Sequence, residues 1–522
     1  MILKSIVIIL ILNSLCEAYK ILLVFPVPGR SHAILGEGYV RHLLNDGHEV
    51  TYITPITMKN SHPKLRQIDV STNFELMPTD ILFNIKSIIN NELNYKDSKF
   101  LLYANSDFAN SAINHPNVQR LIQDSSEHFD VVIAEWLYTE LYAGFSSVFN
   151  CPLIWSSSME PDSMVLDLID EALNPAYNPH ILSDKLPPFS FFDRVNELWI
   201  LVDTKIFKWR LRHRENIMFN TAFESSVAKR GRKLPPFNEV RYNGSLVLGN
   251  SHIASGAAVH LPYNYVPIGG YHINEIIDPL PTNLQKIMDD AKNGLIYFSM
   301  GSMLKSRSIP MEIKRGLLTV FSKLNQSVLW KFEEELPDLP KNVHIVPWAP
   351  QLGILAHPNC KLFITHGGLL SILESLHFAV PVIGIPMYGD QHLNINRAVE
   401  KGFGKRVDLN SEIATQMDIA IKEILNEPRF VQKLKEYSLI FHDRLNPPGK
   451  VLSYWVSHVI RTKGAPHLRS PGMLVPWYQK LYLDLAFLIL VTLYISFKVL
   501  IKVITVILSF RSGINRIKKK LL

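Results

Sequence analysis

Short apolar segments alternate with helical patterns between residues 294 and 401, and this alternation limits the fold more than any other feature of the sequence. Buried strands are predicted at Gly294–Met300, Ser327–Phe332, Val343–Pro347, Lys361–Thr365 and Val380–Pro386, and helices at Met311–Leu324, Leu369–Phe378 and Gln391–Lys401. Strands separated by helices pair in parallel, because the chain crosses back over the sheet between them. The pattern predicts a doubly wound parallel sheet, in which ligands bind beyond the carboxyl ends of the strands.

The beginning of the chain shows the same type of pattern. A strand at Lys20–Phe25, a helix at Ala33–Asn45 and a strand at Glu49–Thr54 predict a βαβ opening, and residues 129–135 predict a further buried strand. Prolines and glycines crowd residues 262–281 and predict a linker. We therefore expect an α/β protein with two doubly wound Rossmann-like domains and a helical segment after them. The expected boundaries are residues 19–265, 266–446 and 447–480.

The N-terminus has the layout of a secretory signal peptide. Lys4 precedes the apolar run Ser5–Leu12, and small residues follow up to Ala18. This order predicts a cleavable signal peptide, residues 1–18. An uncleaved anchor and a buried strand are the alternatives.

A second apolar run, near the C-terminus, is long enough to cross a membrane. Leu485–Phe497 is uncharged, and the apolar pattern continues beyond Lys498 and Lys502. Because both lysine side chains can extend to the nearer interface, a single transmembrane helix is predicted at residues 481–508. An apolar core helix is the alternative.

The net charge of +7 belongs to the C-terminal end rather than to a folded domain. Seven Lys and Arg residues and no acidic residue follow Phe497, so residues 1–497 are neutral overall. A nucleic-acid-binding domain carries its own basic excess, so the composition gives no support for a nucleic-acid partner. Positive charge after the apolar run predicts a cytosolic tail, residues 509–522, and a lumenal position for residues 19–480.

Three further features bear on the compartment. The last residues, Lys519-Lys520-Leu521-Leu522, resemble the dilysine retrieval signal of endoplasmic-reticulum membrane proteins, although a positively charged flank accounts for the same lysines. Asn243 and Asn325 begin N-x-Ser sequons and are candidate glycosylation sites in a lumenal protein, where chance matches are also common. Cys151 and Cys360 are expected to be buried reduced thiols rather than a disulfide bridge.

The strand end richest in polar residues is Thr365-His366-Gly367-Gly368. Two glycines allow a sharp turn and a close approach of the backbone to a ligand. The free N–H groups at the start of the next helix suit a phosphate, to which the histidine can also donate. A capping box between Ser371 and Glu374 is the structural alternative.

This strand end is part of a larger resemblance. The chain resembles the UDP-glycosyltransferase family, and its loop sequence is more similar to the invertebrate members. The resemblance consists of an ordered set of motifs: Trp348-Ala349-Pro350-Gln351, His357-Pro358, Thr365-His366-Gly367-Gly368, Glu374, Pro381, Pro386, Asp390-Gln391 and Asn394. The resemblance extends over essentially the whole chain. It implies the GT-B fold and a membrane-anchored enzyme that transfers a hexose from a UDP-sugar to a hydroxyl of a small lipophilic acceptor. It favours glucose, with glucuronate as the alternative, and implies neither a cofactor nor a metal.

The resemblance also assigns roles around the nucleoside. Trp348 should stack on the uracil, with Gln351 hydrogen-bonding the nucleoside. Glu374 should accept hydrogen bonds from the ribose hydroxyls, and Ser302 should reach the phosphates or the nucleoside. For Trp348 a core position is the alternative, since it ends an apolar strand.

Further roles follow for the diphosphate and the sugar. His366, Gly368 and Ser371 should hold the diphosphate, while Leu370 stands where many members of the family have Asn, so one phosphate contact is absent or replaced by backbone. Asp390-Gln391 should bind the sugar hydroxyls. The alternative for the aspartate is an ordinary helix N-cap.

His32, after the first strand, matches the catalytic base of the family. A neutral imidazole there can take a proton from an acceptor hydroxyl, and a single displacement then inverts the anomeric carbon. The family orients this histidine with an Asp, for which the strand register offers Glu135 and a shifted loop offers Glu140; neither carboxylate is the third alternative. The carboxylate would stabilise an imidazolium.

Two other function classes compete with this interpretation. A nicotinamide oxidoreductase is disfavoured, because the first strand runs into Pro26–Arg30 rather than a G-x-G-x-x-G fingerprint. A non-catalytic, membrane-anchored binding protein of the same fold is the main alternative, with Leu370 in its favour and the retained His32 against it. The sequence leaves the oligomeric state open, a homo-oligomer included.

Overall fold

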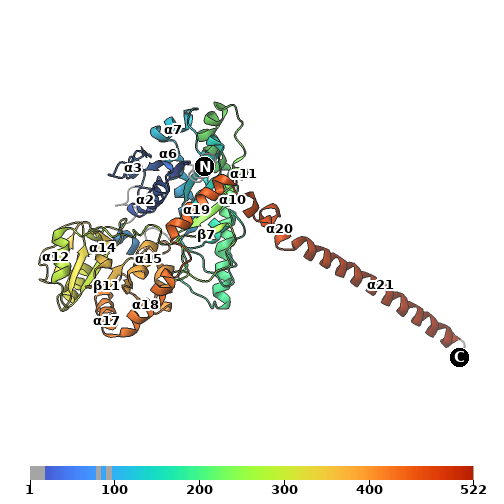
Figure 1. Ribbon diagram of the computed structural model, residues 1–522. Helices are drawn as coiled ribbons and strands as arrows, with labels where there is room; N and C mark the ends of the chain where they lie inside the picture. Colours follow the sequence, from blue (N-terminus) through green and yellow to red (C-terminus); the bar gives the residue numbers. More distant parts are fainter. Residues whose placement is uncertain (1–17, 78–83, 90–96, 521–522) are drawn as a thin grey trace, which may run out of the picture. The chain divides into compact units, whose positions relative to one another are not determined.

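Two parallel β-sheets form the framework of the computed structural model (Figure 1). The structure describes residues 18–77, 84–89 and 97–520, and side chains up to residue 515. The chain divides into two units, Met1–Arg469 and Ser470–Leu522, and both sheets belong to the first. The expected signal peptide, apart from Ala18, and the last two residues of the dilysine end lie outside the described residues.

The first sheet has seven strands in the order β3-β2-β1-β4-β5-β6-β7. Every neighbouring pair is parallel. The strands are β1 (Lys20–Val24), β2 (Glu49–Thr54), β3 (Leu65–Asp69), β4 (Val131–Trp136), β5 (Leu153–Ser157), β6 (Leu246–Gly249) and β7 (Tyr265–Pro267). The helices between them are α2 (Arg30–Asn45), α3 (Asn73–Leu76), α5 (Ile85–Ile89), α6 (Ser98–Ile113), α7 (Pro116–Gln123), α8 (Gly144–Phe149), α9 (Ser163–Leu166), α10 (Phe191–Ala228) and α11 (Phe237–Arg241), with the 3₁₀ turn η1 (Leu141–Ala143).

The second sheet has six strands in the order β10-β9-β8-β11-β12-β13, again all parallel. The strands are β8 (Leu295–Ser299), β9 (Ser327–Lys331), β10 (Val343–Val346), β11 (Cys360–Thr365), β12 (Val382–Gly384) and β13 (Gly404–Arg406). The helices are α12 (Thr282–Asp290), α13 (Met311–Phe321), α14 (Gln351–Ala356), α15 (Leu369–Phe378), α16 (Gln391–Glu400), α17 (Ile413–Asn426) and α18 (Pro428–His442), with the 3₁₀ turn η2 (Ser306–Ser308). The expected fold class, two doubly wound α/β domains, is confirmed.

The central strands are almost continuously apolar because helices cover both faces of each sheet. In β1, Ile21, Leu22 and Leu23 are fully buried, and β4 is buried along its whole length. The single charged residue of β4, Glu135, lies next to the end of that strand. A buried carboxylate lowers the stability of the fold unless a hydrogen bond or a positive charge compensates it. Glu135 is therefore a candidate for the functional site.

The strand order of each sheet reverses at one point. In the first sheet this point lies between β1 and β4, and in the second between β8 and β11. The loops that follow these strands diverge to opposite faces of the sheet and leave a crevice between them. His32 follows β1, and His366 follows β11, so both reversal points carry a histidine.

Two expected boundaries in the first domain are wrong. The first helix begins at Arg30 rather than Ala33, because Gly29 takes the extended N-cap conformation and places His32 in the first helical turn. The domain boundary at residues 265 and 266 cuts β7, which pairs with β6 in the first sheet. The proline-rich sequence there indicated a linker, but an edge strand tolerates Pro267 because its missing N–H is not needed for the ladder.

The segment after the second domain also differs from expectation. Helix α19 (Pro448–Arg461) returns to the first domain and packs on α2, where Leu452 and Val456 join the core that contains Leu35 and Tyr39 (Figure 1). The 3₁₀ turn η3 (Pro466–Leu468) follows. The expected segment, residues 447–480, is therefore split, and its part up to Arg469 belongs to the first unit.

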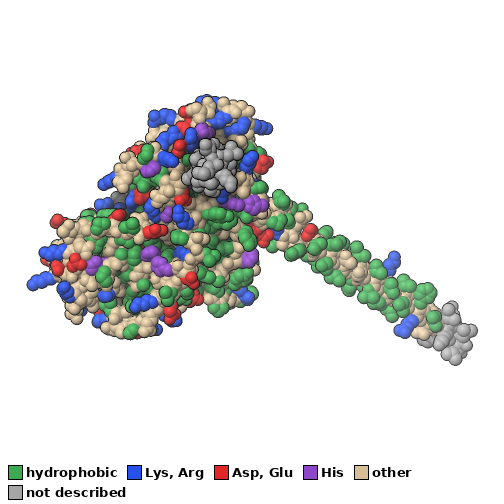
Figure 2. Space-filling view, in the orientation of Figure 1, with side chains coloured by type: hydrophobic (Ala, Val, Ile, Leu, Met, Phe, Trp, Pro, Cys, Tyr) green, Lys and Arg blue, Asp and Glu red, His purple; other side chains and the backbone are tan. Residues whose placement is uncertain are grey.

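The second unit consists of helical turns and one long apolar helix. It contains η4 (Pro471–Leu474), α20 (Trp477–Lys480) and α21 (Leu483–Lys520). Residues 483–515 are long and apolar enough to cross a membrane, with a mean hydropathy of 2.3, and hydrophobic side chains cover this helix in Figure 2. The helix extends beyond the expected span, residues 481–508, because nothing after Leu508 breaks it.

Candidate active site

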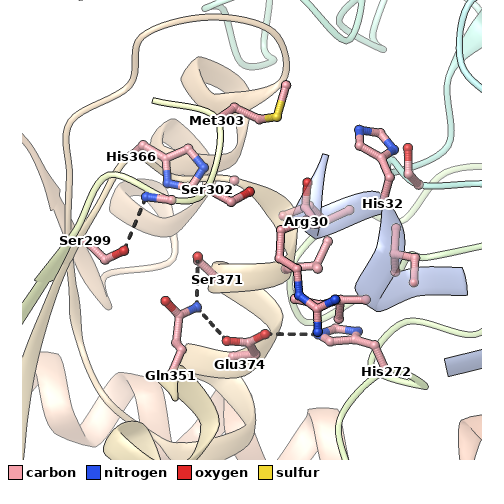
Figure 3. Close-up of a pocket in the computed structure, with 18 of the residues that line it drawn as sticks. Arg30, His32, His272, Ser299, Ser302, Met303, Gln351, His366, Ser371 and Glu374 are labelled. Atoms are coloured by element: carbon pink, nitrogen blue, oxygen red, sulfur yellow. Dashed lines mark hydrogen bonds and ion pairs between the residues drawn. The ribbon is translucent and has the colours of Figure 1, made fainter. Parts of the chain in front are cut away.

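A cavity of about 720 Å³ lies between the carboxyl ends of the two sheets. Its lining comes from α2 and α6 of the first domain and from the strand ends and α14–α16 of the second (Figure 3). Ten residues proposed from the sequence line it: His32, Ser302, Trp348, Gln351, His366, Gly368, Ser371, Glu374, Asp390 and Gln391. The structure thus brings together residues separated by up to 359 positions in the sequence.

His32 pairs with Glu135 at the wall of this cavity. Nδ1 of the imidazole lies 2.5 Å from Oε1 of Glu135, whose side chain is fully buried, while 18% of the His32 side chain is exposed. Burial by itself lowers the pKa of His32, but the charge and hydrogen bond of Glu135, helped by Asp390, outweigh it and raise the pKa above 6.5. Since Nδ1 is occupied, Nε2 is the nitrogen left for a substrate.

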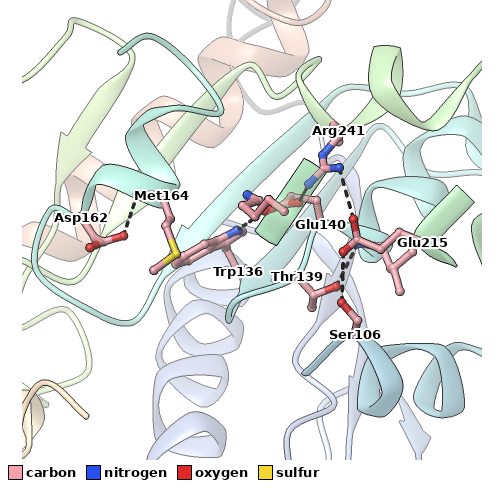
Figure 4. A network of polar contacts seen from close by, with 10 residues as sticks. Ser106, Trp136, Thr139, Glu140, Asp162, Met164, Glu215 and Arg241 are labelled. Carbon is pink, nitrogen blue, oxygen red and sulfur yellow. Dashed lines mark hydrogen bonds and ion pairs between the residues drawn. The ribbon is translucent and has the colours of Figure 1, made fainter. Parts of the chain in front are cut away.

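The alternative partner, Glu140, belongs to a different structure. Its Oε1 accepts hydrogen bonds from Nε1 of Trp136 at 3.1 Å and from Nζ of Lys208 at 2.9 Å, and its Oε2 pairs with Arg241 (Figure 4). Arg241 also lies 3.3 Å from Glu215. Burial raises the pKa of Glu140, but the two cations outweigh it and lower this pKa to about 2. The alternative that Glu140 rather than Glu135 pairs with His32 is therefore not observed, because Lys208 and Arg241 hold Glu140.

Glycines surround the ring of His366. A Cβ on Gly301 would lie 2.5 Å from the imidazole, and one on Gly368 would lie 2.6 Å from it. Gly301 and Gly367 have positive φ angles of 82° and 85°, which glycine adopts without strain. His366 is half-buried, and desolvation together with the charge of Lys331 lowers its pKa to about 4. The imidazole is therefore neutral at pH 7 and carries one N–H.

The capping box expected as an alternative at α15 is not formed. The N-cap residue is Gly368, which makes no side-chain cap. Ser371 and Glu374 instead both accept from Nε2 of Gln351, at 3.2 Å and 2.6 Å (Figure 3). The hydroxyl of Tyr297 donates to Oε1 of Gln351 at 3.3 Å. These contacts fix the side chains at the start of α15 as a polar group facing the cavity.

His272 contacts the second oxygen of Glu374. Its Nε2 lies 3.3 Å from Oε1 of Glu374, and its side chain is fully buried (Figure 3). His272 comes from the segment between the domains, where Arg41 of α2 donates to the carbonyl of Tyr271 at 2.8 Å. The sequence showed no role for His272, because its neighbours in the sequence say nothing about its neighbours in space.

Trp348 is not a core residue, since 53% of it is exposed. Nζ of Lys331 lies 5.5 Å from the centre of its ring and donates to the carbonyl of Gly301 at 2.8 Å. Lys331 is buried at the end of β9, and burial lowers its pKa. A lysine that ends an apolar strand was the available signal for this residue, which the sequence analysis missed.

Asp390 and Gln391 lie at the start of α16. Asp390 occupies the N-cap position without a side-chain cap, and its Oδ2 accepts from Asn394 at 2.9 Å. Burial raises the pKa of Asp390. Oε1 of Gln391 accepts from the backbone N–H groups of Met387 and Tyr388, at 2.9 Å and 3.2 Å. The ordinary N-cap alternative for Asp390 is therefore not observed, and Nε2 of Gln391 remains for a ligand.

The remaining candidates lie outside the cavity. Asn243 and Asn325 are both exposed, and the side chain of Asn243 accepts from Arg469. Cys151 and Cys360 are free thiols, and burial raises the pKa of each to about 12. Among the described residues, no group of three or more His, Cys, Asp and Glu side chains is arranged to hold a metal ion.

Comparisons with known proteins agree with this geometry. The family model described as "UDP-glucoronosyl and UDP-glucosyl transferase" matches residues 20–520. The chain belongs to this family. UDP-glucosyltransferase 2 of Dactylopius coccus is 33% identical over 491 residues, covering 92% of each chain, and human UDP-glucuronosyltransferase 2B10 is 28% identical over 472 residues, covering 85% of each. The protein is a UDP-glycosyltransferase, which removes the oxidoreductase alternative and establishes a UDP-sugar as its donor.

The comparison with solved structures concerns the fold. The glycosyltransferase of kitacinnamycin has a TM-score of 0.55 at 16% identity, with 85% of this chain and 99% of that one covered. The glycosyltransferase VinC, solved in complex with DTDP, has a TM-score of 0.54 at 13% identity with the same coverage. These likenesses establish the GT-B fold.

The two buried carboxylates should respond differently to the same change. Glu140→Gln leaves Arg241 short of a charged partner and should cost about 3–5 kcal/mol of stability, measured by chemical denaturation. Glu135→Gln should cost transferase activity instead, and Glu140→Gln should keep activity per folded molecule. Equal activities for the two variants under conditions where both are folded would contradict this division.

Proposed function

We propose that the protein transfers a hexose from a UDP-sugar, with inversion, to a hydroxyl of a small lipophilic acceptor. One observation carries the proposal: the His32–Glu135 pair faces the side chains proposed to bind the donor across a single cavity. An acceptor hydroxyl gives its proton to Nε2 of His32 as its oxygen attacks the anomeric carbon. The bond from that carbon to the diphosphate oxygen breaks, and UDP leaves with the electron pair. Glu135 stabilises the imidazolium.

The donor side supplies the groups that UDP needs. Trp348 is exposed for stacking on the uracil, and Glu374 is held by Gln351 and His272 so that its oxygens meet the ribose hydroxyls. Negative charge grows on the diphosphate during the reaction. His366 and the N-terminus of α15 stabilise it, and Lys331 adds a buried cation nearby. The proposal therefore assigns no step to a metal or a cofactor.

Two of the cations that line the cavity, Arg30 and Arg41, support glucose as the sugar, and the third, Lys331, is assigned above to the diphosphate. Arg30 already makes two hydrogen bonds to Glu37, at 2.6 Å and 3.1 Å. Arg41 binds Asn274 and a backbone carbonyl. A glucuronate carboxylate has to be paired when it is buried, and these two arginines are already engaged. The hydroxyls of glucose are neutral, so hydrogen bonds to Asp390 and Gln391 are sufficient to bind them.

The first domain provides the acceptor end. Apolar side chains dominate there, among them Val27, Phe100, Leu101, Leu137 and Met159. Such a lining favours a small lipophilic alcohol or phenol, which is consistent with a role in detoxification. In our proposal α21 anchors the enzyme in the endoplasmic-reticulum membrane with its first unit in the lumen, the signal peptide is removed, and exposed Asn243 and Asn325 are open to glycosylation.

His32→Ala should separate catalysis from donor binding. Loss of a general base should lower kcat by about a hundredfold to ten-thousandfold, while UDP affinity measured by calorimetry stays near that of the unaltered enzyme. Asp390→Ala serves as the matched control, because it should raise the KM for the UDP-sugar. Retention of full activity in His32→Ala would remove it as the base.

The pH dependence should report the Glu135 contact. The base acts when neutral, so kcat/KM should fall as the pH drops through the raised pKa of His32. Glu135→Gln removes the negative charge that raises this pKa and leaves burial, which lowers it. The acid limb should therefore move to lower pH while the plateau rate falls. An acid limb at the same pH in both enzymes would exclude Glu135 as the cause.

Donor choice can be tested by direct competition. The enzyme is given UDP-glucose and UDP-glucuronate together with a panel of phenols, and the products are resolved by mass. We expect glucosides to predominate by at least about tenfold, the ratio that corresponds to about 1.4 kcal/mol. Preferential formation of glucuronides would show that a cation in the cavity pairs with the sugar carboxylate after all.

A further inference from the structure

Residues 268–274, which we call the crossing segment, follow β7 and lead to the second domain. Tyr271 of this segment belongs to the buried core that α2 forms with the first sheet. The next residue, His272, contacts Glu374 of α15. Two neighbouring residues therefore reach the helix that carries the proposed base and the side chain proposed to bind the ribose.

The crossing segment is fixed to the second half of α2. Two side chains of this helix donate to the carbonyl oxygen of Tyr271, Nη2 of Arg41 at 2.8 Å and Nε2 of His42 at 2.9 Å. The Tyr271 ring packs edge-on against Tyr39, with 4.9 Å between the ring centres. A Cβ on Gly38 would lie 2.9 Å from the Tyr271 ring, so this glycine lets the helix and the segment touch. The positions of α2 and of the crossing segment consequently depend on each other.

Both domains hold the crossing segment just before Tyr271. The N–H of Gly269 donates to the carbonyl oxygen of Ser251, which follows β6 in the first domain, at 3.0 Å. The carbonyl oxygen of Gly269 accepts from Nη1 of Arg444, which follows α18 in the second domain, at 2.7 Å. The backbone that carries His272 is therefore restrained from both sides.

The imidazole of His272 is buried and faces Glu374 (Figure 3). Its Nε2 lies 3.3 Å from Oε1 of the carboxylate, which is long for a hydrogen bond. Within the described part of the chain, neither ring nitrogen of His272 has a hydrogen-bond partner of good geometry. Buried polar groups in this condition are rare and need an explanation. An apolar side chain would fill the same space without that cost, so packing alone does not explain a histidine here.

His272 is the group placed to restrain the second oxygen of Glu374. Gln351 restrains the first, since its Nε2 donates to Oε2 of Glu374 at 2.6 Å. A carboxylate that accepts from ribose hydroxyls needs a fixed orientation, which side chains around it supply. With a partner on each oxygen, the carboxylate is held in one orientation, and its remaining lone pairs are left for the ribose.

We propose that His272 positions Glu374 for the ribose, and that the crossing segment ties this contact to helix α2. The proposal rests on the ribose-binding role proposed above for Glu374. His272 acts through Glu374, so it is a positioning residue rather than a catalytic one. Because α2 also carries His32, the crossing segment holds the proposed base and the ribose contact at a fixed separation.

The affinities of the full-length enzyme for UDP and for 2′-deoxy-UDP, measured by calorimetry, test this. The unaltered enzyme should bind UDP at least about tenfold more tightly, because the 2′-hydroxyl donates to a charged group. His272→Ala should weaken UDP binding alone and reduce this ratio to about threefold or less. His272→Gln keeps an N–H directed at Glu374 and should restore most of the ratio. His272→Phe fills the space without a donor, and it replaces the alanine variant if that variant does not fold.

Three further variants locate the effect. Glu374→Gln removes the charge that accepts from the ribose and should remove most of the preference for UDP. His48→Ala removes another buried histidine, which does not line the cavity, and should keep the full ratio. His42→Ala carries the test to α2. His42 does not line the cavity either, so its loss reaches Glu374 through the crossing segment and should lower the ratio.

Each result separates this proposal from the one on which it rests. A full ratio in His272→Ala, beside a lost ratio in Glu374→Gln, overturns the role of His272 and leaves that of Glu374. A full ratio in Glu374→Gln overturns the ribose contact itself, and the positioning role with it. Equal weakening of both nucleotides in His272→Ala is the result of a purely structural role and overturns the positioning. A full ratio in His42→Ala overturns the tie to α2.

Discussion

Parallel strand pairing is the constraint on which the rest of this structure depends. It sends all carboxyl ends of a sheet to one edge, and the reversal of strand order between β1 and β4, and between β8 and β11, opens a crevice at that edge in each domain. His32 follows one reversal point and His366 the other. That geometry explains why a cavity forms and why the proposed base faces the proposed donor site across it. It also explains why these residues lie far apart in the sequence.

Two buried glutamates, Glu135 and Glu140, lie near the first reversal point. Their partners differ, and we therefore propose a catalytic role for the first and a structural role for the second. Glu135 has an imidazole as its partner, a group that titrates within the physiological range, so its charge raises the pKa of the proposed base. Glu140 has a lysine and an arginine, which remain charged, so its cluster holds the first domain together. Five positions in the sequence separate two carboxylates whose proposed roles differ because their neighbours differ.

Helix α10 shows the same dependence on neighbours at the surface. A helix normally turns its apolar side to the core, because that side gains most from leaving water. Here α6 makes hydrogen bonds to Thr204 and Glu215 of α10, and the apolar side chains between Phe191 and Trp209 stay exposed, while the C-terminal part of the helix buries Phe219 and Phe223.

The sequence by itself determined the alternation of strands and helices, the glycine turn before α15 and the carboxylate at the end of β4, because each depends on residues close together in the chain. The register of one strand was enough to favour Glu135. The tertiary structure alone decided that Glu140 belongs with Arg241, that β7 is an edge strand, and that His272 and Lys331 reach the cavity. It also decided that the apolar side of α10 faces outward. Periodicity shows which side chains share a face, but only packing between segments far apart in the chain decides what that face meets.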